Sequence, residues 1–111
     1  MARGKLTLSA TNVTTTGAKG TGVLLGAVGA TQYLYATVHC LTAGTTVTIK
    51  IQSDDNAGFT SPTDRITLSA ITATGGTWVT RLAGSITDTY YRFNVTAVTG
   101  TFTLAGAIGI A

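Results

Sequence analysis

The stretch Gln32-Tyr-Leu-Tyr-Ala-Thr-Val-His-Cys-Leu41 changes character at every second residue. One parity consists of the small or aliphatic side chains Leu34, Ala36, Val38 and Cys40. The other parity consists of Tyr33, Tyr35, Thr37 and His39. Because successive side chains of a strand point to opposite faces, a period of two predicts a half-buried β-strand. We expect the aliphatic set to face a core and the aromatic and polar set to face outward.

The same period recurs along the whole chain, and glycine-containing breaks separate several of the segments. The predicted strands are Lys5–Thr14, Gly22–Val28, Gln32–Leu41, Thr45–Ser53, Arg65–Ile71, Thr77–Leu82, Thr89–Val98 and Thr101–Ile110. Glycine permits the positive φ angles that tight turns need, so these breaks are typical of turns. Eight short strands at this spacing favour a two-sheet sandwich, a jelly roll or a small barrel, with no helix of ordinary length.

Parity also predicts the core. In Thr45–Ser53 we expect Val47, Ile49 and Ile51 to face inward. In Thr89–Val98 the inward set is Tyr91, Phe93, Val95 and Ala97, and the last strand adds Phe102, Leu104, Ile108 and Ile110. A slip of one residue would invert every such assignment.

The composition offers little catalytic chemistry. Among 111 residues there are four Asp, no Glu, one His, one Cys and 25 Thr. Catalysis requires titratable or nucleophilic groups gathered in one site, so we expect a protein that is not an enzyme and uses no cofactor. Only 10% of the residues are charged, against about 25% in typical domains. Such low charge predicts that part of the surface is covered in an assembly.

Two pairs of residues are candidates for chemical sites. Asp54 and Asp55 lie in a long connection beside Asn56 and Gly58, but they lack the alternate spacing and the closing Glu of a calcium loop. His39 and Cys40 are adjacent, so on a strand they point to opposite faces and cannot act as a nucleophile–base pair. We therefore predict no metal site and no catalytic residue.

The positive charge is concentrated near the N-terminus. Arg3, Lys5 and Lys19 lie among the first 20 residues, which contain no acid, whereas the rest of the chain is neutral. We expect residues 1–20 to form a basic arm or a first strand, and residues 21–111 to form the sandwich domain. Three cations are too few for nucleic acid, which requires a denser basic patch. No stretch is long enough for a membrane helix, so the expected partner is an acidic protein surface.

The outward aromatic residues predict a second contact surface. Tyr33, Tyr35 and His39 share one parity, and Tyr90 and Arg92 share the outward parity of a later strand. Tyrosine and arginine are enriched at protein interfaces, so these five residues predict a patch through which the chain also associates with itself. Trp78 is open to two interpretations, a sugar-stacking platform or an anchor of the core or sheet edge.

Three segments together resemble a known family. They are Ile51-Gln-Ser-Asp-Asp-Asn-Ala-Gly-Phe-Thr-Ser-Pro62, Gly76-Thr-Trp-Val79 and Ile86-Thr-Asp-Thr-Tyr-Tyr-Arg-Phe-Asn-Val95. The chain from about Tyr33 to Ile110 is similar to the capsid decoration (cementing, or staple) proteins of the epsilon-fifteen type of short-tailed bacteriophage. The resemblance implies an all-β, jelly-roll-like sandwich, homodimers at capsid two-fold positions, and extended termini that clasp the major capsid protein.

On this basis the expected function is capsid decoration. The protein would be made in the host cytoplasm and then bind the outer surface of the virion, where it staples neighbouring major capsid subunits. Fold does not decide function, so two alternatives stay open. One is a carbohydrate-binding or lectin-like module, and the other is a structural protein of the phage tail.

Overall fold

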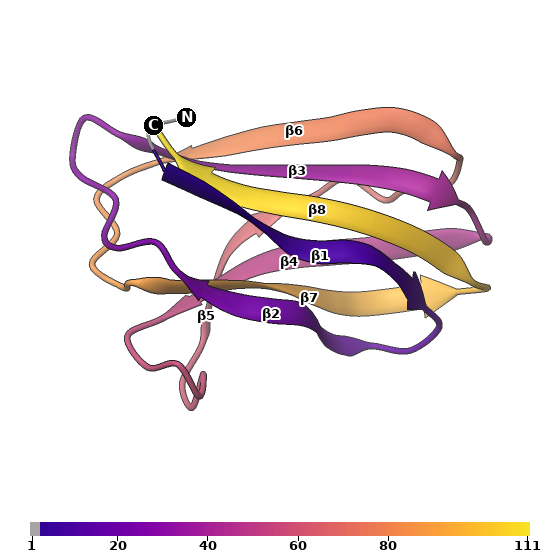
Figure 1. The fold of residues 1–111 in the computed structure, drawn as a ribbon, viewed down its shortest axis with the longest axis horizontal. Helices are drawn as coiled ribbons and strands as arrows, with labels where there is room; N and C mark the ends of the chain where they lie inside the picture. The colour runs from indigo at the N-terminus through magenta and orange to yellow at the C-terminus, as the bar shows by residue number, and fades with distance from the viewer. Residues whose placement is uncertain (1–2) are drawn as a thin grey trace.

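The computed structural model describes the backbone of residues 3–111 and the side chains of all of these except 3, 6, 9–10, 21 and 76–80. It contains eight strands, which form two antiparallel four-stranded sheets (Figure 1). Sheet A has the order β1-β8-β3-β6 and consists of β1 (Arg3–Val13), β8 (Phe102–Ile110), β3 (Tyr33–Thr42) and β6 (Gly75–Ala83). Sheet B has the order β2-β7-β4-β5 and consists of β2 (Gly17–Leu24), β7 (Tyr90–Thr99), β4 (Thr46–Asp54) and β5 (Thr63–Thr67).

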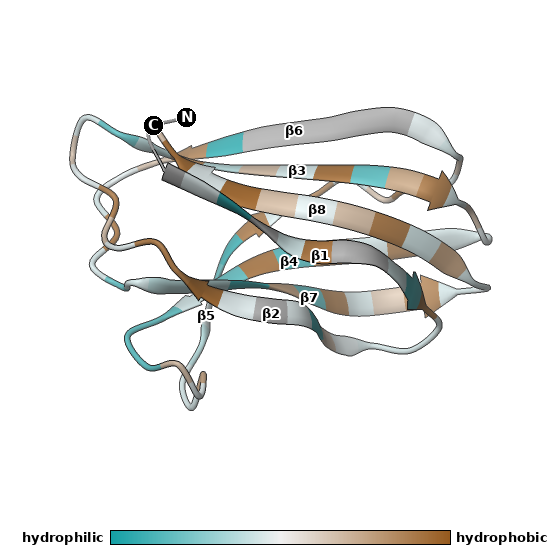
Figure 2. Cartoon of the chain, viewed as in Figure 1, coloured by the Kyte–Doolittle hydropathy of each residue, from teal (hydrophilic) through white to brown (hydrophobic). Residues whose placement is uncertain are grey.

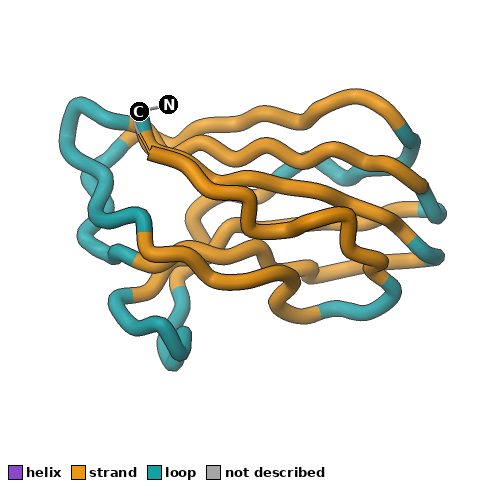
Figure 3. Tube along the Cα trace, in the orientation of Figure 1, coloured by secondary structure: helices purple, strands orange, loops and turns teal. Residues whose placement is uncertain are grey.

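The strand pairing is that of a jelly roll. The first strand pairs with the last, the second with the second to last, and so on inward: β1 with β8, β2 with β7, β3 with β6, and β4 with β5. This is the pairing of one long hairpin that has been rolled into two facing sheets, which the double Greek key of a jelly roll produces. The described residues form strands and loops and no helix (Figure 3). No helix in this part of the chain is therefore long and apolar enough to cross a membrane. The predicted fold class is confirmed.

The core lies between the sheets, and hydrophobic residues alternate along β3, β7 and β8 (Figure 2). The side chains of the aliphatic set of β3 are fully buried. Tyr91, Phe93 and the inward residues of β4 and β8 are fully buried as well. The ring of Phe93 packs where a Cβ at Gly106 would lie, because that atom would be only 2.8 Å from the ring. A glycine on β8 therefore makes room for a large aromatic residue of the facing sheet.

Ala97 is the exception among the predicted core residues, because it is exposed. The register of β7 against β4 shifts between Thr48↔Ala97 and Ile49↔Val95, so Thr96 is an extra residue on β7. A β-bulge of this kind reverses the parity of every residue beyond it. The prediction for Ala97 was wrong for this reason, and Val98 packs against the core in its place.

The N-terminal segment also differs from the arm that was expected. Residues 3–13 form β1, which pairs with β8 from Arg3↔Ile110 to Val13↔Phe102. Residues 17–20 already belong to β2. The two strands meet closely, because a Cβ at Gly20 would overlap the carbonyl oxygen of Thr7. Of the two possibilities for residues 1–20, the described part forms the first strand and not a free arm.

Candidate protein-binding surface

The outer face of sheet B carries polar side chains that bind one another. Lys50 Nζ lies 3.2 Å from Asp64 Oδ2, and Gln52 Nε2 donates to Asp64 Oδ1 at 3.0 Å. Arg92 Nε donates to Gln52 Oε1 at 2.9 Å, which extends the chain of contacts across β5, β4 and β7. The hydrogen bonds from Gln52 and Lys50 lower the pKa of Asp64. Lys50, Asp64 and Arg92 thus each bind another side chain of the same face.

The loop of residues 55–62, which connects β4 and β5, folds back on the same face. Phe59 is buried and its ring lies 4.4 Å from the guanidinium carbon of Arg92. Asp54, at the end of β4, fastens the loop by accepting the backbone N–H of Asp55 at 2.7 Å and of Ser61 at 2.9 Å. The hydrogen bond from Ser61 lowers the pKa of Asp54, whereas the side-chain hydrogen bond with Asp54 raises the pKa of Asp55.

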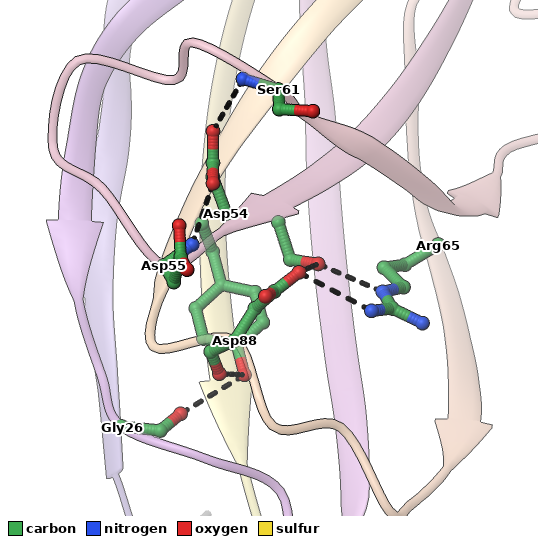
Figure 4. A network of polar contacts seen from close by, with 8 residues as sticks. Gly26, Asp54, Asp55, Ser61, Arg65 and Asp88 are labelled. Carbon is green, nitrogen blue, oxygen red and sulfur yellow. Dashed lines mark hydrogen bonds and ion pairs between the residues drawn. The ribbon is translucent and has the colours of Figure 1, made fainter.

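A second polar network joins four chain segments beneath this loop (Figure 4). Arg65 donates to Ser53 Oγ at 2.8 Å and pairs with Asp88 at 3.2 Å, while Ser53 Oγ donates to Asp88 at 2.8 Å. The hydroxyl of Tyr91 lies 2.9 Å from the carbonyl of Gly26 and 3.0 Å from that of Asp88. These contacts hold strands and loops together, which is a structural role for the polar groups at this end of the sandwich.

The outer face of sheet A has a different character. We define it by Tyr33, Tyr35, Thr37 and His39 of β3, Thr103, Ala105, Ala107 and Gly109 of β8, and Arg81 of β6. The register places Tyr35 between Gly109 and Arg81, and Thr37 beside Ala107. The outward residues of the central strand β8 are small, so this part of the face is flat. The larger tyrosines lie beside them on β3.

The aromatic residues of this face form a compact group with one cation. The rings of Tyr33 and Tyr35 are 6.3 Å apart and tilted by 57°. The guanidinium carbon of Arg81 lies 4.6 Å from the centre of the Tyr33 ring, within the range of a cation–π contact. Arg81 itself is exposed, so its remaining N–H groups can reach a partner.

Charge is distributed unequally between the sheets. The strands of sheet A contain Arg3, Lys5 and Arg81 but no acidic residue. All four Asp belong to sheet B or to loops, where Lys19, Lys50, Arg65 and Arg92 balance them. The net charge of +3 is therefore carried by the strands of sheet A. The sequence had placed this surplus at the N-terminus, and the fold relocates it to one sheet.

The predicted contact residues divide between the two sheets. Tyr33, Tyr35 and His39 lie together on the outer face of sheet A, as expected from their parity. Tyr90 and Arg92 lie on β7 in sheet B, so they do not extend this patch. That part of the prediction was wrong, because outward residues of two strands share a face only when the strands share a sheet.

The predicted basic residues are also separated. Arg3 and Lys5 lie on the edge strand β1 of sheet A, whereas Lys19 lies on β2 of sheet B and donates from Nζ to Thr15 Oγ1 at 2.9 Å. Sequence reasoning missed Arg81, which joins the tyrosines through the pairing of β6 with β3. The sequence did place Arg81 in a predicted strand. It gave no indication that this strand pairs with the strand that carries the tyrosines. The side chain of Trp78 lies outside the described part of the chain, so its two interpretations stay open.

Among the described residues there is no pocket and no group of three or more His, Cys, Asp or Glu that could hold a metal ion. Cys40 is a free thiol in the core, and burial raises its pKa. The chemical character that distinguishes this molecule therefore lies in its two contrasting outer faces.

Comparison with known proteins gives one informative match. No protein family matches the sequence. No curated protein matches it either. The crystal structure of the SPBc2 prophage-derived protein YomS is similar to the fold, with a TM-score of 0.54 over 97% of this chain and 91% of that chain. The two sequences are 22% identical, so the similarity is one of fold.

Proposed function

We propose that this chain is a non-enzymatic structural protein of a bacteriophage particle that decorates the outer surface of the head. In this role each copy binds neighbouring major capsid subunits and holds them together. Many copies act in parallel, so each contact can be modest. Contacts that are linked on one particle gain further from their high effective concentration.

One observation carries the proposal: the outer face of sheet A is a low-relief surface with tyrosines, small residues and an exposed arginine. Tyrosine and arginine are enriched in the centres of protein interfaces, whereas acidic residues are depleted there. The sequence resemblance to phage decoration proteins supports the same role. The prophage origin of a protein with a similar fold agrees with it.

The test is whether the protein binds heads. Particles produced without this protein are incubated with the purified chain and then separated by sedimentation. We expect the chain to appear with the particles at a fixed, saturable number of copies per head. Decorated heads should also withstand heat or osmotic shock better than undecorated heads. Binding to isolated tails, or to neither part of the particle, would contradict the proposal.

A second candidate function is favoured by the pair Tyr33–Tyr35. Two half-exposed aromatic rings on a sheet face are also the arrangement on which sugars stack. A carbohydrate-binding module would bind a panel of glycans with an affinity that falls in a Tyr35→Ala variant. Binding to heads that is unaffected by added glycans would favour capsid decoration.

A further inference from the structure

We infer that the outer face of sheet A is the surface that docks on the capsid, and that it fits a protein surface with an apolar centre and carboxylate groups opposite Arg81. This inference rests on the proposed function and adds the docking face and the chemistry of the partner. It leaves the outer face of sheet B exposed on the particle.

Charge is the first argument. The strands of sheet A contain no acid, and Arg81 is the cation of the described outer face; Lys5 pairs with Ile108, whose side chain faces the core, so it belongs to the edge of the sheet and not to this face. On the outer face, the exposed Arg81 is anchored to the ring of Tyr33, so its orientation is already restricted before binding. A guanidinium group matches a carboxylate through two parallel hydrogen bonds. A partner that presents carboxylates is therefore complementary to this face.

Shape and size are the second argument. Thr37, Ala105, Ala107 and Gly109 form a smooth strip beside the tyrosines. Four strands about 4.8 Å apart and about 30 Å long give a projected area of about 570 Å². A specific interface uses about 800 Å² from each partner, so this face supplies most of the area that such an interface needs.

The contrast with sheet B is the third argument. There the groups of Lys50, Asp64, Gln52 and Arg92 are engaged with one another, and Phe59 of the loop packs on Arg92. Docking through that face would require these contacts to be broken or buried with their charges. Binding through sheet A requires no such rearrangement.

A second copy of the chain is the competing occupant of this face. Two copies packed through their sheet A faces would place Arg81 of each copy in an interface to which these strands contribute no acid. Like charges placed opposite one another weaken an interface. The homodimer implied by the family resemblance would then use a different surface of the molecule.

Two alanines provide a matched test of the docking face. Ala107 lies on β8 in the outer face of sheet A, and Ala97 lies exposed on β7 in sheet B. Ala107→Glu and Ala97→Glu introduce the same group on opposite sides. With heads that lack the protein as the probe, we expect Ala107→Glu to bind more than about tenfold more weakly, as for a residue central to an interface. Ala97→Glu should bind within about twofold of the unmodified chain.

The outcomes of this test separate the two proposals. If the unmodified chain does not bind heads, the proposed function fails and this inference falls with it. If it binds and Ala97→Glu is the weakened variant, or if neither variant is weakened, the docking face has been wrongly assigned while the function stands. Melting temperatures show whether each variant is folded. Should Ala107→Glu unfold, the exposed Arg81→Glu replaces it as the variant of sheet A.

The partner's chemistry is tested at Arg81. We expect Arg81→Glu to weaken binding to heads by more than about tenfold and Arg81→Lys to retain most of it. Added salt should weaken the unmodified chain more than Arg81→Ala, since one screened charge pair has been removed. Equal binding and equal salt dependence of all three variants would overturn the carboxylate assignment. A dimer in sedimentation that Ala107→Glu converts to a monomer would instead identify a second copy as the occupant.

Discussion

At the scale of single residues, the contact between Phe93 and Gly106 shows how closely the two sheets pack. Phe93 is fully buried on β7, and Gly106 is buried on β8 of the facing sheet. A Cβ on Gly106 would lie 2.8 Å from the Phe93 ring and 3.2 Å from the carbonyl oxygen of Thr37. Core side chains are close-packed, so neither neighbour can withdraw freely.

Gly106→Ala should therefore destabilise the protein, although alanine is usually more favourable than glycine inside a strand. We expect a loss of about 1–3 kcal/mol in the free energy of unfolding, the range for overpacking a core. Urea denaturation measures it. The double variant Gly106→Ala with Phe93→Leu should lose less than the sum of the two single variants. A fully additive result would show that the two residues are not in contact.

Asp54 gives the stability a defined pH dependence. Its folded pKa is lowered from 3.8, so its stabilising contribution is present above that value and is lost as the pH falls through the folded pKa. Asp64 acts in the same direction. Asp55 acts in the opposite direction, because its pKa is raised and the folded state holds its proton more tightly. Acidification below pH 4 should therefore weaken the loop of residues 55–62.

An Asp54→Asn variant isolates this contribution. Its free energy of unfolding should be lower than that of the unmodified chain at pH 6, and the difference should shrink at pH 3. Asp55→Asn is the matched control, because removing a group with a raised pKa should increase stability at pH 6. Urea denaturation at both pH values provides the comparison. A difference for Asp54→Asn that is the same at pH 3 and pH 6 would contradict the role of its charge.

At the scale of secondary structure, β1 is the element whose role changed most. The alternation of residues 5–14 predicted a strand, yet the local excess of Arg3, Lys5 and Lys19 suggested an arm that docks on a partner. The structure pairs β1 with β8 along its length, including Arg3↔Ile110 and Lys5↔Ile108. The start of this strand is therefore part of the edge of sheet A.

Deleting residues 3–5 should accordingly reduce the melting temperature. The deletion removes three residues that pair with Ile108, Gly109 and Ile110 of β8. A loss of 1 kcal/mol lowers the melting temperature of a domain of this size by about 4 °C or more. Replacing Arg3 and Lys5 by Ser should leave it nearly unchanged, since the backbone pairing persists. Calorimetry distinguishes the two, and an unaltered melting temperature in the deletion would indicate a free arm.

At the scale of the whole molecule, the fold separates charges that are neighbours in the sequence. Lys5 and Lys19 lie within fifteen residues of each other but on different sheets. Lys5 pairs with the core-facing Ile108 on the edge strand of sheet A, so it lies at the rim of the docking face. If heads bind sheet A, Lys5→Ser should reduce the salt dependence of binding by less than Arg81→Ala does, whereas Lys19→Ser should leave it unchanged. Sedimentation with heads at low and high salt measures both. An equal effect of the two variants would favour a contact made by the N-terminal segment and not by one sheet.

The sequence by itself determined the fold class, the number of strands, and most of the core. These follow from side-chain alternation and from glycine at the breaks, which are local properties that act within each strand. They also placed Tyr33, Tyr35 and His39 on one outward face, because residues of the same strand share a face by parity alone.

Only the tertiary structure decided which strands are neighbours, and hence which surface residues lie together. The jelly-roll pairing brought Arg81 beside Tyr35, and it moved Tyr90 and Arg92 to the opposite sheet. A bulge at Thr96 exposed Ala97, an effect that depends on the register with β4. The same pairing collected the net positive charge on sheet A. Strand order and register arise from long-range packing, so the period of a single strand carries no record of them.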